Sequence, residues 1–363
     1  MRILYLLSSS NLWGARKSFL EILKFINREI FIPFTILPRP GPLENELRKI
    51  QVEYRIIHLP PWRKWNRWRE RKKALKELLS FLEENNFSLI HANSHFVTPY
   101  AIKTGKLLEL PVITHIRALL TPDKIRKYLI QKSDLIICNS IASSQVFLPH
   151  LQQKVKVIYN GIDTDYYKPA PLEKVKEFRK SLGLSDEPIL GYLGKISREK
   201  GVDILLEILP ELKRQGIKIL VGGEVRRERD KDLETALKNS GAVLLGNVDN
   251  PPLFYSSINI LFFPTRIESF GRVAVESLSC KTPVIASRVG GVKEIVEDGK
   301  TGYLFSLENP REALEKILIL VNNPQKRKEM GEEGRKKAQK NFEIRKKVKE
   351  IEEMYSYIIG GPS

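Results

Sequence analysis

Short apolar runs alternate with helical segments along most of the chain, and this alternation restricts the fold more than any other feature. Seven such runs occupy the first half, and the scheme starts again at residues 188–196. An apolar run followed by an amphipathic helix, as expected over residues 202–216, is typical of a parallel strand covered on both faces. The sequence therefore predicts an α/β protein made of doubly wound sheets.

The expected strands divide into two groups, separated by a segment with two prolines, Pro169 and Pro171. We predict two Rossmann-like domains that face each other across a deep cleft, with ligands beyond the carboxyl ends of the strands. The strands of the first half are expected at residues 2–7, 31–38, 54–60, 88–94, 111–117, 134–140 and 155–161. Helical periodicity predicts a helix at residues 15–25, after the first of them. Those of the second half are expected at residues 188–196, 217–223, 242–248, 258–264 and 282–288.

The composition limits the partners. The 363 residues suit two domains, and the formal net charge of +18 favours an anionic partner: a nucleotide, a nucleic acid or an acidic lipid surface. No apolar run approaches the roughly 18 residues of a membrane-spanning helix, and the apolar start is too short for a signal peptide, so a cytoplasmic protein is expected. Neither the two cysteines nor the five histidines show metal-ligand spacing, so no metal is expected.

A glycine-flanked pair of lysines follows the first expected strand of the second half. Lys195 and Lys200 lie in the connection GYLGKISREKGVD, beside Gly194 and Gly201, just before an expected helix. Glycines let the backbone approach a ligand closely, and two ammonium groups suit a diphosphate. The alternative interpretation is that both are ordinary surface lysines of a basic protein.

Two glutamates flank the start of another expected helix, in RIESFGRVAVES. Helical pattern begins near Gly271, so Glu268 lies before the positive end of the helix and Glu276 lies inside it, near the end of the second turn. One acid can hold a group in front of the helix and the other a group beside it, without forming an acid/base pair. In the alternative interpretation, Glu268 caps the helix and Glu276 is solvated.

These motifs stand in an order that resembles a known family. NGID with a downstream proline (160–163, then Pro169), GKISREKG (194–201) and ESFGRVAVES (268–277) precede TPVIAS and GGVKEIVEDGKTGYLF. The chain resembles glycosyltransferase family 4, retaining GT-B enzymes that use nucleotide sugars. The resemblance implies an acceptor-binding domain at residues 1–165, a nucleotide-sugar-binding domain at 166–343 and a final helix at 344–363 that packs back on the first domain.

The resemblance also implies roles for matching residues. Lys200 would bind the donor diphosphate, Glu276 the ribose hydroxyls, and Lys195 stands where the family usually has arginine, without its forked geometry. The loop at residues 246–248 would lie near the nucleotide base. The catalytic candidates are Glu268 and His115. The donor-binding candidates are Gly14, Lys195, Lys200, Asn247, Val248, Glu268, Ser269, Phe270, Gly271, Arg272, Val273 and Glu276. A DxD metal pattern at Asp163-Thr164-Asp165 falls in the linker, and the resemblance implies metal-independent transfer.

The acceptor side is expected in the first half. His115 and Arg117 end an expected strand, and His115 either lines the reaction centre or is a structural histidine with satisfied hydrogen bonds. The acceptor-side candidates are Trp13, His95 and Arg117. Trp13 replaces the first of two glycines that the family often has, and Gly14 matches the second.

Residues 60–79 form the most unusual segment, because tryptophans stand three residues apart at positions 62, 65 and 68. On one helix, the three rings would form a stripe among cationic side chains, which is typical of interfacial helices. This segment is predicted either to dock on an anionic membrane or to bury its tryptophans in the first domain. The membrane-surface candidates are Trp62, Arg63, Lys64, Trp65, Arg67 and Trp68.

The sequence thus predicts a retaining glycosyltransferase that needs no cofactor besides its substrate, a UDP, GDP or ADP sugar. The expected acceptor is a glycan or lipid-linked glycan of cell-envelope polysaccharide or lipopolysaccharide synthesis. The enzyme is expected in the cytoplasm, with the inner face of the cytoplasmic membrane as a candidate surface. The alternatives are an epimerase or phosphorylase of the same fold, or a basic nucleic-acid-binding protein, although nucleic acid is not an expected partner.

Overall fold

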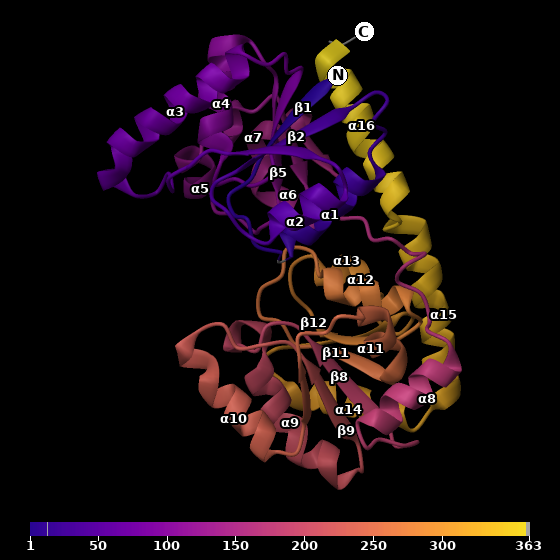
Figure 1. Cartoon of the computed structure of the whole chain (residues 1–363). Helices are drawn as coiled ribbons and strands as arrows, with labels where there is room; N and C mark the ends of the chain where they lie inside the picture. Colours follow the sequence, from indigo (N-terminus) through magenta and orange to yellow (C-terminus); the bar gives the residue numbers. More distant parts are fainter. Residues whose placement is uncertain (13, 361–363) are drawn as a thin grey trace. The chain divides into compact units, whose positions relative to one another are not determined.

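A computed structural model describes residues 1–12 and 14–360. The chain forms two compact units: Met1–Gly161 together with the segment that starts at Ile344, and Ile162–Glu343. Each unit is built around one parallel sheet with helices on both faces (Figure 1). The predicted α/β class with two doubly wound sheets is therefore confirmed.

The sheet of the first unit has seven parallel strands in the order β3-β2-β1-β4-β5-β6-β7. Each overlaps one of the seven expected runs. Continuous apolar runs suit the central strands, which are buried on both faces, whereas the edge strands β3 and β7 are partly exposed. The strands are β1 (Arg2–Leu6), β2 (Ile32–Leu37), β3 (Glu53–Ile56), β4 (Leu89–Ala92), β5 (Val112–Ile116), β6 (Leu135–Cys138) and β7 (Val155–Val157).

Helices cover both faces of this sheet. One face packs against α1, α2 and α16, and the other packs against α3 and α4. The helices are α1 (Ala15–Phe25), α2 (Leu43–Lys49), α3 (Trp68–Glu83), α4 (Thr98–Leu108), α5 (Pro122–Lys127), α6 (Ile141–Ser144), α7 (Leu148–Leu151) and α16 (Ile344–Gly360). Helix α1 has the bounds that its helical periodicity predicts, because its apolar side chains recur on the face that packs against the sheet.

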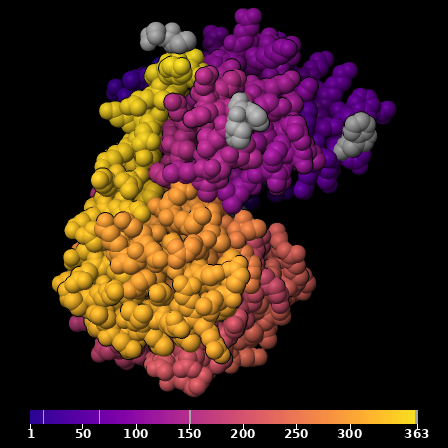
Figure 2. Space-filling model, turned by 180° about the vertical axis from the view of Figure 1, so that it is seen from behind, coloured from indigo at the N-terminus to yellow at the C-terminus, as the bar shows by residue number. Residues whose placement is uncertain are grey.

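The last helix, α16, completes the core of the first unit. Its buried side chains Val348, Ile351 and Tyr355 belong to the same apolar cluster as strand β1. In the space-filling view, α16 lies along the flank of this unit (Figure 2). The Tyr355 hydroxyl lies 2.9 Å from the Tyr5 hydroxyl and 2.6 Å from His91 Nδ1, so one polar cluster ties the end of the chain to two central strands.

The sheet of the second unit has six parallel strands in the order β10-β9-β8-β11-β12-β13. The five expected strands are confirmed. A sixth, β13, was not marked as a strand by the sequence pattern, because its short run follows a turn-rich segment. The strands are β8 (Ile189–Leu193), β9 (Lys218–Gly222), β10 (Val243–Gly246), β11 (Ile260–Phe263), β12 (Val284–Ser287) and β13 (Gly302–Phe305).

The helices of the second unit build a core around the central strands. Side chains of α9, α10, α14 and α15 cover one face, where they pack against β8, β9, β11 and β12. The turn after α12 approaches α15 so closely that a Cβ on Gly331 would lie 2.1 Å from the Lys281 carbonyl oxygen. The helices are α8 (Leu172–Ser181), α9 (Val202–Arg214), α10 (Lys231–Asn239), α11 (Pro251–Ser257), α12 (Arg272–Ser279), α13 (Val292–Ile295), α14 (Pro310–Val321) and α15 (Pro324–Asn341). No helix in the described ranges is long and apolar enough to span a membrane.

The hydroxyl of Tyr355 provides a test of how α16 is held. In Tyr355→Phe, His91 Nδ1 and the Tyr5 hydroxyl each lose a partner in a fully buried site, so we expect the free energy of unfolding to fall by about 1–3 kcal/mol. Urea titration of the intact chain measures this change. The control is Tyr357→Phe on the same helix, where the ring is 53% exposed and no loss is expected. Equal stabilities of the two variants would contradict the anchoring role.

Candidate functional site

The candidate site of the second unit lies where two neighbouring strands end. Strand β8 leads to Lys195 and Lys200, and strand β11 leads to Glu268. These strands pair in parallel, so their carboxyl ends lie at the same edge of the sheet. Side chains far apart in the sequence are thereby brought together.

The two connections make direct contact. Lys200 Nζ lies 2.7 Å from Glu268 Oε2, with both side chains about three-quarters buried. The backbone N–H of Arg266 donates to the Glu199 carbonyl oxygen at 3.0 Å. Gly201 has a φ of 74°, and a Cβ there would lie 1.9 Å from the Pro264 carbonyl oxygen, so this close approach requires glycine.

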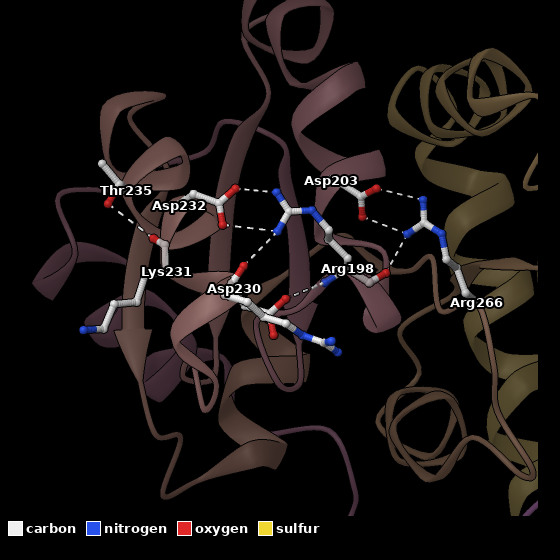
Figure 3. A network of polar contacts seen from close by, with 8 residues as sticks. Arg198, Asp203, Asp230, Lys231, Asp232, Thr235 and Arg266 are labelled. Atoms are coloured by element: carbon white, nitrogen blue, oxygen red, sulfur yellow. Dashed lines mark hydrogen bonds and ion pairs between the residues drawn. The ribbon is translucent and has the colours of Figure 1, made fainter.

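A network of arginines and aspartates supports this contact (Figure 3). The guanidinium of Arg266 donates to both carboxylate oxygens of Asp203, at 2.8 and 2.7 Å, and to the Arg198 carbonyl oxygen at 2.6 Å. Arg198 in turn pairs with Asp232 and donates to the Arg229 carbonyl oxygen. Forked pairs fix geometry as well as charge, so the network holds the lysine connection against the loop before α12.

Helix α12 begins where the sequence predicts, at Arg272 after Gly271, whose φ of 111° suits glycine. Gly271 has no side chain to cap this helix, and just before it the Phe270 N–H donates to Glu268 Oε1 at 3.5 Å. The interpretation of Glu268 as a helix cap stays untested. Arg272 and Val273 lie in the first turn, where the backbone N–H groups carry the positive end of the helix dipole. Of the residues before the helix, Phe270 is buried, and the Ser269 carbonyl oxygen lies where Gly291 leaves room for it.

Glu276 is buried on the flank of α12. Its side chain is 7% exposed, so the interpretation of a solvated glutamate is wrong. Arg272 Nε donates to Oε1 at 2.6 Å, and the Tyr255 hydroxyl donates to Oε2 at 2.9 Å. Burial, followed by the nearby Glu276 charge, raises the pKa of Tyr255 well above its ordinary value, so its hydroxyl remains a proton donor. The carboxylate is thus oriented in advance, with further lone pairs for a ligand hydroxyl.

Lys195 lies in a second group of cations. Burial lowers its pKa, and the charge of Arg227 lowers it further. Arg226 and Arg227 follow strand β9, and the sequence analysis did not select them. The signal was available, because a pair of arginines stands just beyond an expected strand. They strengthen the positive potential at this edge of the sheet.

Asn247 and Val248 follow the edge strand β10. Asn247 Nδ2 donates to Asp249 Oδ1 at 2.9 Å, and Val248 packs in the space left by Gly222. They lie beyond the carboxyl end of a strand of the same sheet, as their predicted place near the nucleotide base requires. Their role as base contacts stays a prediction.

The acceptor-side candidates lie in the first unit. His95 and Arg117 line a cavity of about 380 Å³ at the carboxyl ends of β1, β4 and β5. Burial, with a smaller effect of Lys124, lowers the pKa of His95 to about 4, so its imidazole is neutral at pH 7. Gly14 precedes α1 with a φ of 42°, and Trp13 lies outside the described residues.

His115 is almost fully buried, at 1% exposure, and is not among the residues that line this cavity. Its Nδ1 lies 3.3 Å from Arg117 Nη2, and its Nε2 has no hydrogen-bond partner within the described part of the chain. Burial and the Arg117 charge hold its pKa well below the ordinary value, so the ring is neutral. His115 contacts a cavity residue, and its catalytic role stays a prediction.

The tryptophan-rich segment does not form the expected single helix. Trp62 lies in a turn, a 3₁₀ turn covers Trp65–Arg67, and α3 starts only at Trp68. The stripe prediction is wrong because Lys64 has an extended backbone, with a ψ of 102°, which separates Trp62 from the helical turns that follow. Trp62 packs edge-on against Tyr100 at 5.3 Å, whereas Trp68 is 55% exposed. Lys64 is exposed, and Arg67 pairs with Glu70.

Within residues 1–12 and 14–360, no cluster of histidine, cysteine and acidic side chains is arranged to hold a metal ion. The DxD pattern has another use, because Asp163 Oδ1 accepts the backbone N–H groups of Asp165 and Tyr166 at 2.9 and 3.1 Å. This carboxylate therefore shapes a turn at the start of the second unit.

Two parallel α/β units, with cations and a helix N-terminus at strand ends, are typical of enzymes that bind phosphorylated small molecules. Comparison with known proteins narrows this class. The family model "Glycosyltransferase Family 4" matches residues 30–166, and "Glycosyl transferases group 1" matches residues 174–337. An uncharacterized glycosyltransferase of Methanocaldococcus jannaschii, MJ1178, is 31% identical over 93% of each chain. The chain therefore belongs to glycosyltransferase family 4 (group 1).

Two further relatives cover nearly the full length. The capsular polysaccharide biosynthesis glycosyltransferase CapM of Staphylococcus aureus is 25% identical over 98% of this chain and 97% of its own. The crystal structure of HepE from Anabaena in complex with UDP superposes with a TM-score of 0.87 and 24% identity, over 98% of this chain and 100% of HepE. The predicted GT-B fold is thereby confirmed.

The arginine network can be tested through local opening. In Arg266→Gln, the forked pair with Asp203 is lost. An exposed pair contributes only about 0–1 kcal/mol to overall stability, so the main expected effect is faster amide exchange at residues 198–201. Hydrogen–deuterium exchange with mass spectrometry measures this rate. The matched control is Arg288→Gln, which removes the pair with Asp298 in the same unit. Unchanged exchange at 198–201 in Arg266→Gln would show that the network does not hold the loop.

Proposed function

We propose that this glycosyltransferase is a retaining, metal-independent enzyme that takes its sugar from a nucleotide-diphosphate donor bound by the second unit. The observation that carries the proposal is the Lys200–Glu268 pair in front of helix α12, with the oriented carboxylate of Glu276 on the helix flank. A cation and the positive end of a helix suit a diphosphate, and a carboxylate suits ribose hydroxyls. UDP is the base to test first, because HepE was crystallized with UDP and with UDP-glucose.

The residues have separate roles in this proposal. Lys195, Lys200 and the start of α12 stabilise the negative charge that develops on the leaving diphosphate. Glu268 exchanges its contact with Lys200 for a sugar hydroxyl, and Glu276 holds the ribose. The acceptor oxygen bonds to the anomeric carbon on the face that the phosphate leaves, and the hydroxyl proton passes to the departing phosphate oxygen. No protein nucleophile is required in this displacement.

The acceptor in this proposal is a glycan or lipid-linked glycan of a cell-envelope polysaccharide or lipopolysaccharide. CapM, whose name assigns it to capsular polysaccharide biosynthesis, supports this acceptor class. The competing functions of the same fold, a nucleotide-sugar epimerase or a phosphorylase, require different substrates from those of a transferase. An epimerase converts the donor in the absence of acceptor, so incubation with donor alone separates it from a transferase.

Donor binding is tested by thermal stabilisation with UDP-, GDP- and ADP-glucose. We expect UDP-glucose to raise the Tm most, and Lys200→Gln and Glu276→Gln to reduce this rise, because each removes a charge-assisted hydrogen bond worth about 1.5–3 kcal/mol. The control is Lys300→Gln, which lies outside the site and pairs with Glu297. If no nucleotide sugar stabilises the wild type, or if both site variants respond like the control, the donor proposal fails.

We also propose that α3 attaches the enzyme peripherally to an anionic membrane. Trp68 is 55% exposed, and Arg69, Lys72, Lys73 and Lys76 are exposed on the same helix. An exposed indole among cations is typical of a surface that contacts acidic lipid headgroups.

Cosedimentation with vesicles that contain phosphatidylglycerol tests this attachment. Each lysine near such a surface contributes about 1 kcal/mol, so Lys72→Gln with Lys73→Gln is expected to weaken binding on the order of 30-fold. The matched control is Lys174→Gln with Lys176→Gln, two exposed lysines of α8. Binding that does not depend on phosphatidylglycerol, or equal losses in both double variants, would count against attachment through α3.

A further inference from the structure

The cavity of the first unit has a cationic lining that the sequence did not predict. It lies at the carboxyl ends of β1, β4 and β5, and residues 59–63, just before the 3₁₀ turn and α3, close one side. Its volume of about 380 Å³ falls within the range of small-molecule cavities. We infer that this cavity selects an acceptor that carries an anionic group, a phosphate or a carboxylate, next to its sugar ring. This inference rests on the proposed transferase function.

The charge of the lining carries this inference. Arg16, Arg63 and Arg117 line the cavity, and none of the described lining residues is an aspartate or glutamate. Guanidinium groups donate charge-assisted hydrogen bonds to phosphate and carboxylate groups. Burial lowers the pKa of Arg16, which shows that this charge is partly removed from water, where an anion is held more strongly.

Two of the arginines are held in place by amide groups. Arg16 donates to Asn11 Oδ1 at 3.1 and 2.9 Å, and Arg117 donates to Asn93 Oδ1 at 3.2 and 3.1 Å. An amide oxygen orients a guanidinium but, being neutral, does not cancel its charge through that bond. These contacts therefore preserve the cationic character of the cavity while they fix its geometry.

Asn93 provides an independent observation. Its Oδ1 is engaged by Arg117, which fixes the orientation of the amide, and its Nδ2 is buried without a hydrogen-bond partner in the described part of the chain. An unsatisfied buried donor is costly and calls for a ligand or a water molecule. Asn93 lines the cavity, so this unsatisfied amide lies in its wall beside Arg117.

The remaining wall suits a sugar ring. Trp62, Phe96 and Tyr128 present aromatic surface, and the neutral His95 packs against Phe96 at 4.0 Å and Tyr128 at 5.2 Å. Aromatic rings offer large apolar faces to the C–H groups of a sugar, and the neighbouring hydroxyls of Ser8, Ser9 and Ser94 offer hydrogen bonds.

Trp62 is itself fixed from outside the cavity. Tyr100 meets its ring edge-on at 5.3 Å, and the Arg71 guanidinium lies 4.9 Å from the ring centre while it donates to the Trp62 carbonyl oxygen at 2.8 Å. The next residue, Arg63, lines the same cavity with an exposed side chain.

The test compares three probes that share an octyl chain: octyl β-glucuronide, octyl phosphate and octyl β-glucoside. Binding to the intact chain is measured by calorimetry at pH 7.5 and moderate salt, below the micelle concentrations. We expect at least one anionic probe to bind about tenfold or more tightly than the glucoside, and Arg63→Gln to remove most of that advantage. The control is Arg69→Gln, an exposed arginine of α3 that does not line the cavity.

The outcomes separate this inference from the donor proposal. Preference for the glucuronide assigns a carboxylate, and preference for octyl phosphate assigns a phosphate. Equal binding of charged and neutral probes, equal effects of Arg63→Gln and Arg69→Gln, or displacement of the anionic probe by UDP would overturn the inference. If UDP-glucose stabilises the protein but the probes show no charge preference, only this inference fails. If the anionic probe binds and no nucleotide sugar does, only the donor proposal fails.

Discussion

The contact between Lys200 and Glu268 is the interaction on which the candidate donor site depends. These residues are 68 positions apart in the chain, and they meet because β8 and β11 are parallel neighbours whose carboxyl ends lie at the same edge. A partly buried ion pair can break when a ligand offers each charge a new partner, whereas the forked Arg266–Asp203 pair beside it keeps the loops together. The site thus combines an ion pair that a ligand can replace, Lys200–Glu268, with a forked pair that fixes the loops, Arg266–Asp203.

The first unit differs from the second in that a row of polar side chains is buried beside its apolar core. The Tyr355 hydroxyl lies within hydrogen-bond distance of both the Tyr5 hydroxyl and His91. The ring centres of His91 and His115 are 5.4 Å apart, and His115 contacts Arg117 at the cavity. Desolvation keeps both imidazoles neutral, so the arginine is the cation of this group. The last helix of the chain therefore supports a cavity that is built from strand ends near the start of the chain.

Many of the strands and helices could be predicted from the pattern of apolar and polar residues along the chain. The apolar runs located all seven strands of the first sheet, and the helical period located α1 and the start of α12 after Gly271. The tryptophan segment shows the limit of such reasoning. Spacing by three suggested one helix, but α3 starts only at Trp68, whose ring is exposed, whereas Trp62 lies in an earlier turn and packs against Tyr100. Strand β13 was missed for a similar reason: its run is too short to be distinguished from a loop.

The sequence by itself determined the alternation of strands and helices, the excess of positive charge and the motifs of the family, because each depends on residues close together in the chain. Only the tertiary structure decided which distant residues meet. It paired Lys200 with Glu268, buried Glu276 between Arg272 and Tyr255, and gathered Arg16, Arg63 and Arg117 around one cavity. The physical reason is that parallel strand order sets these contacts, and this order is fixed by the packing of whole elements rather than by local sequence.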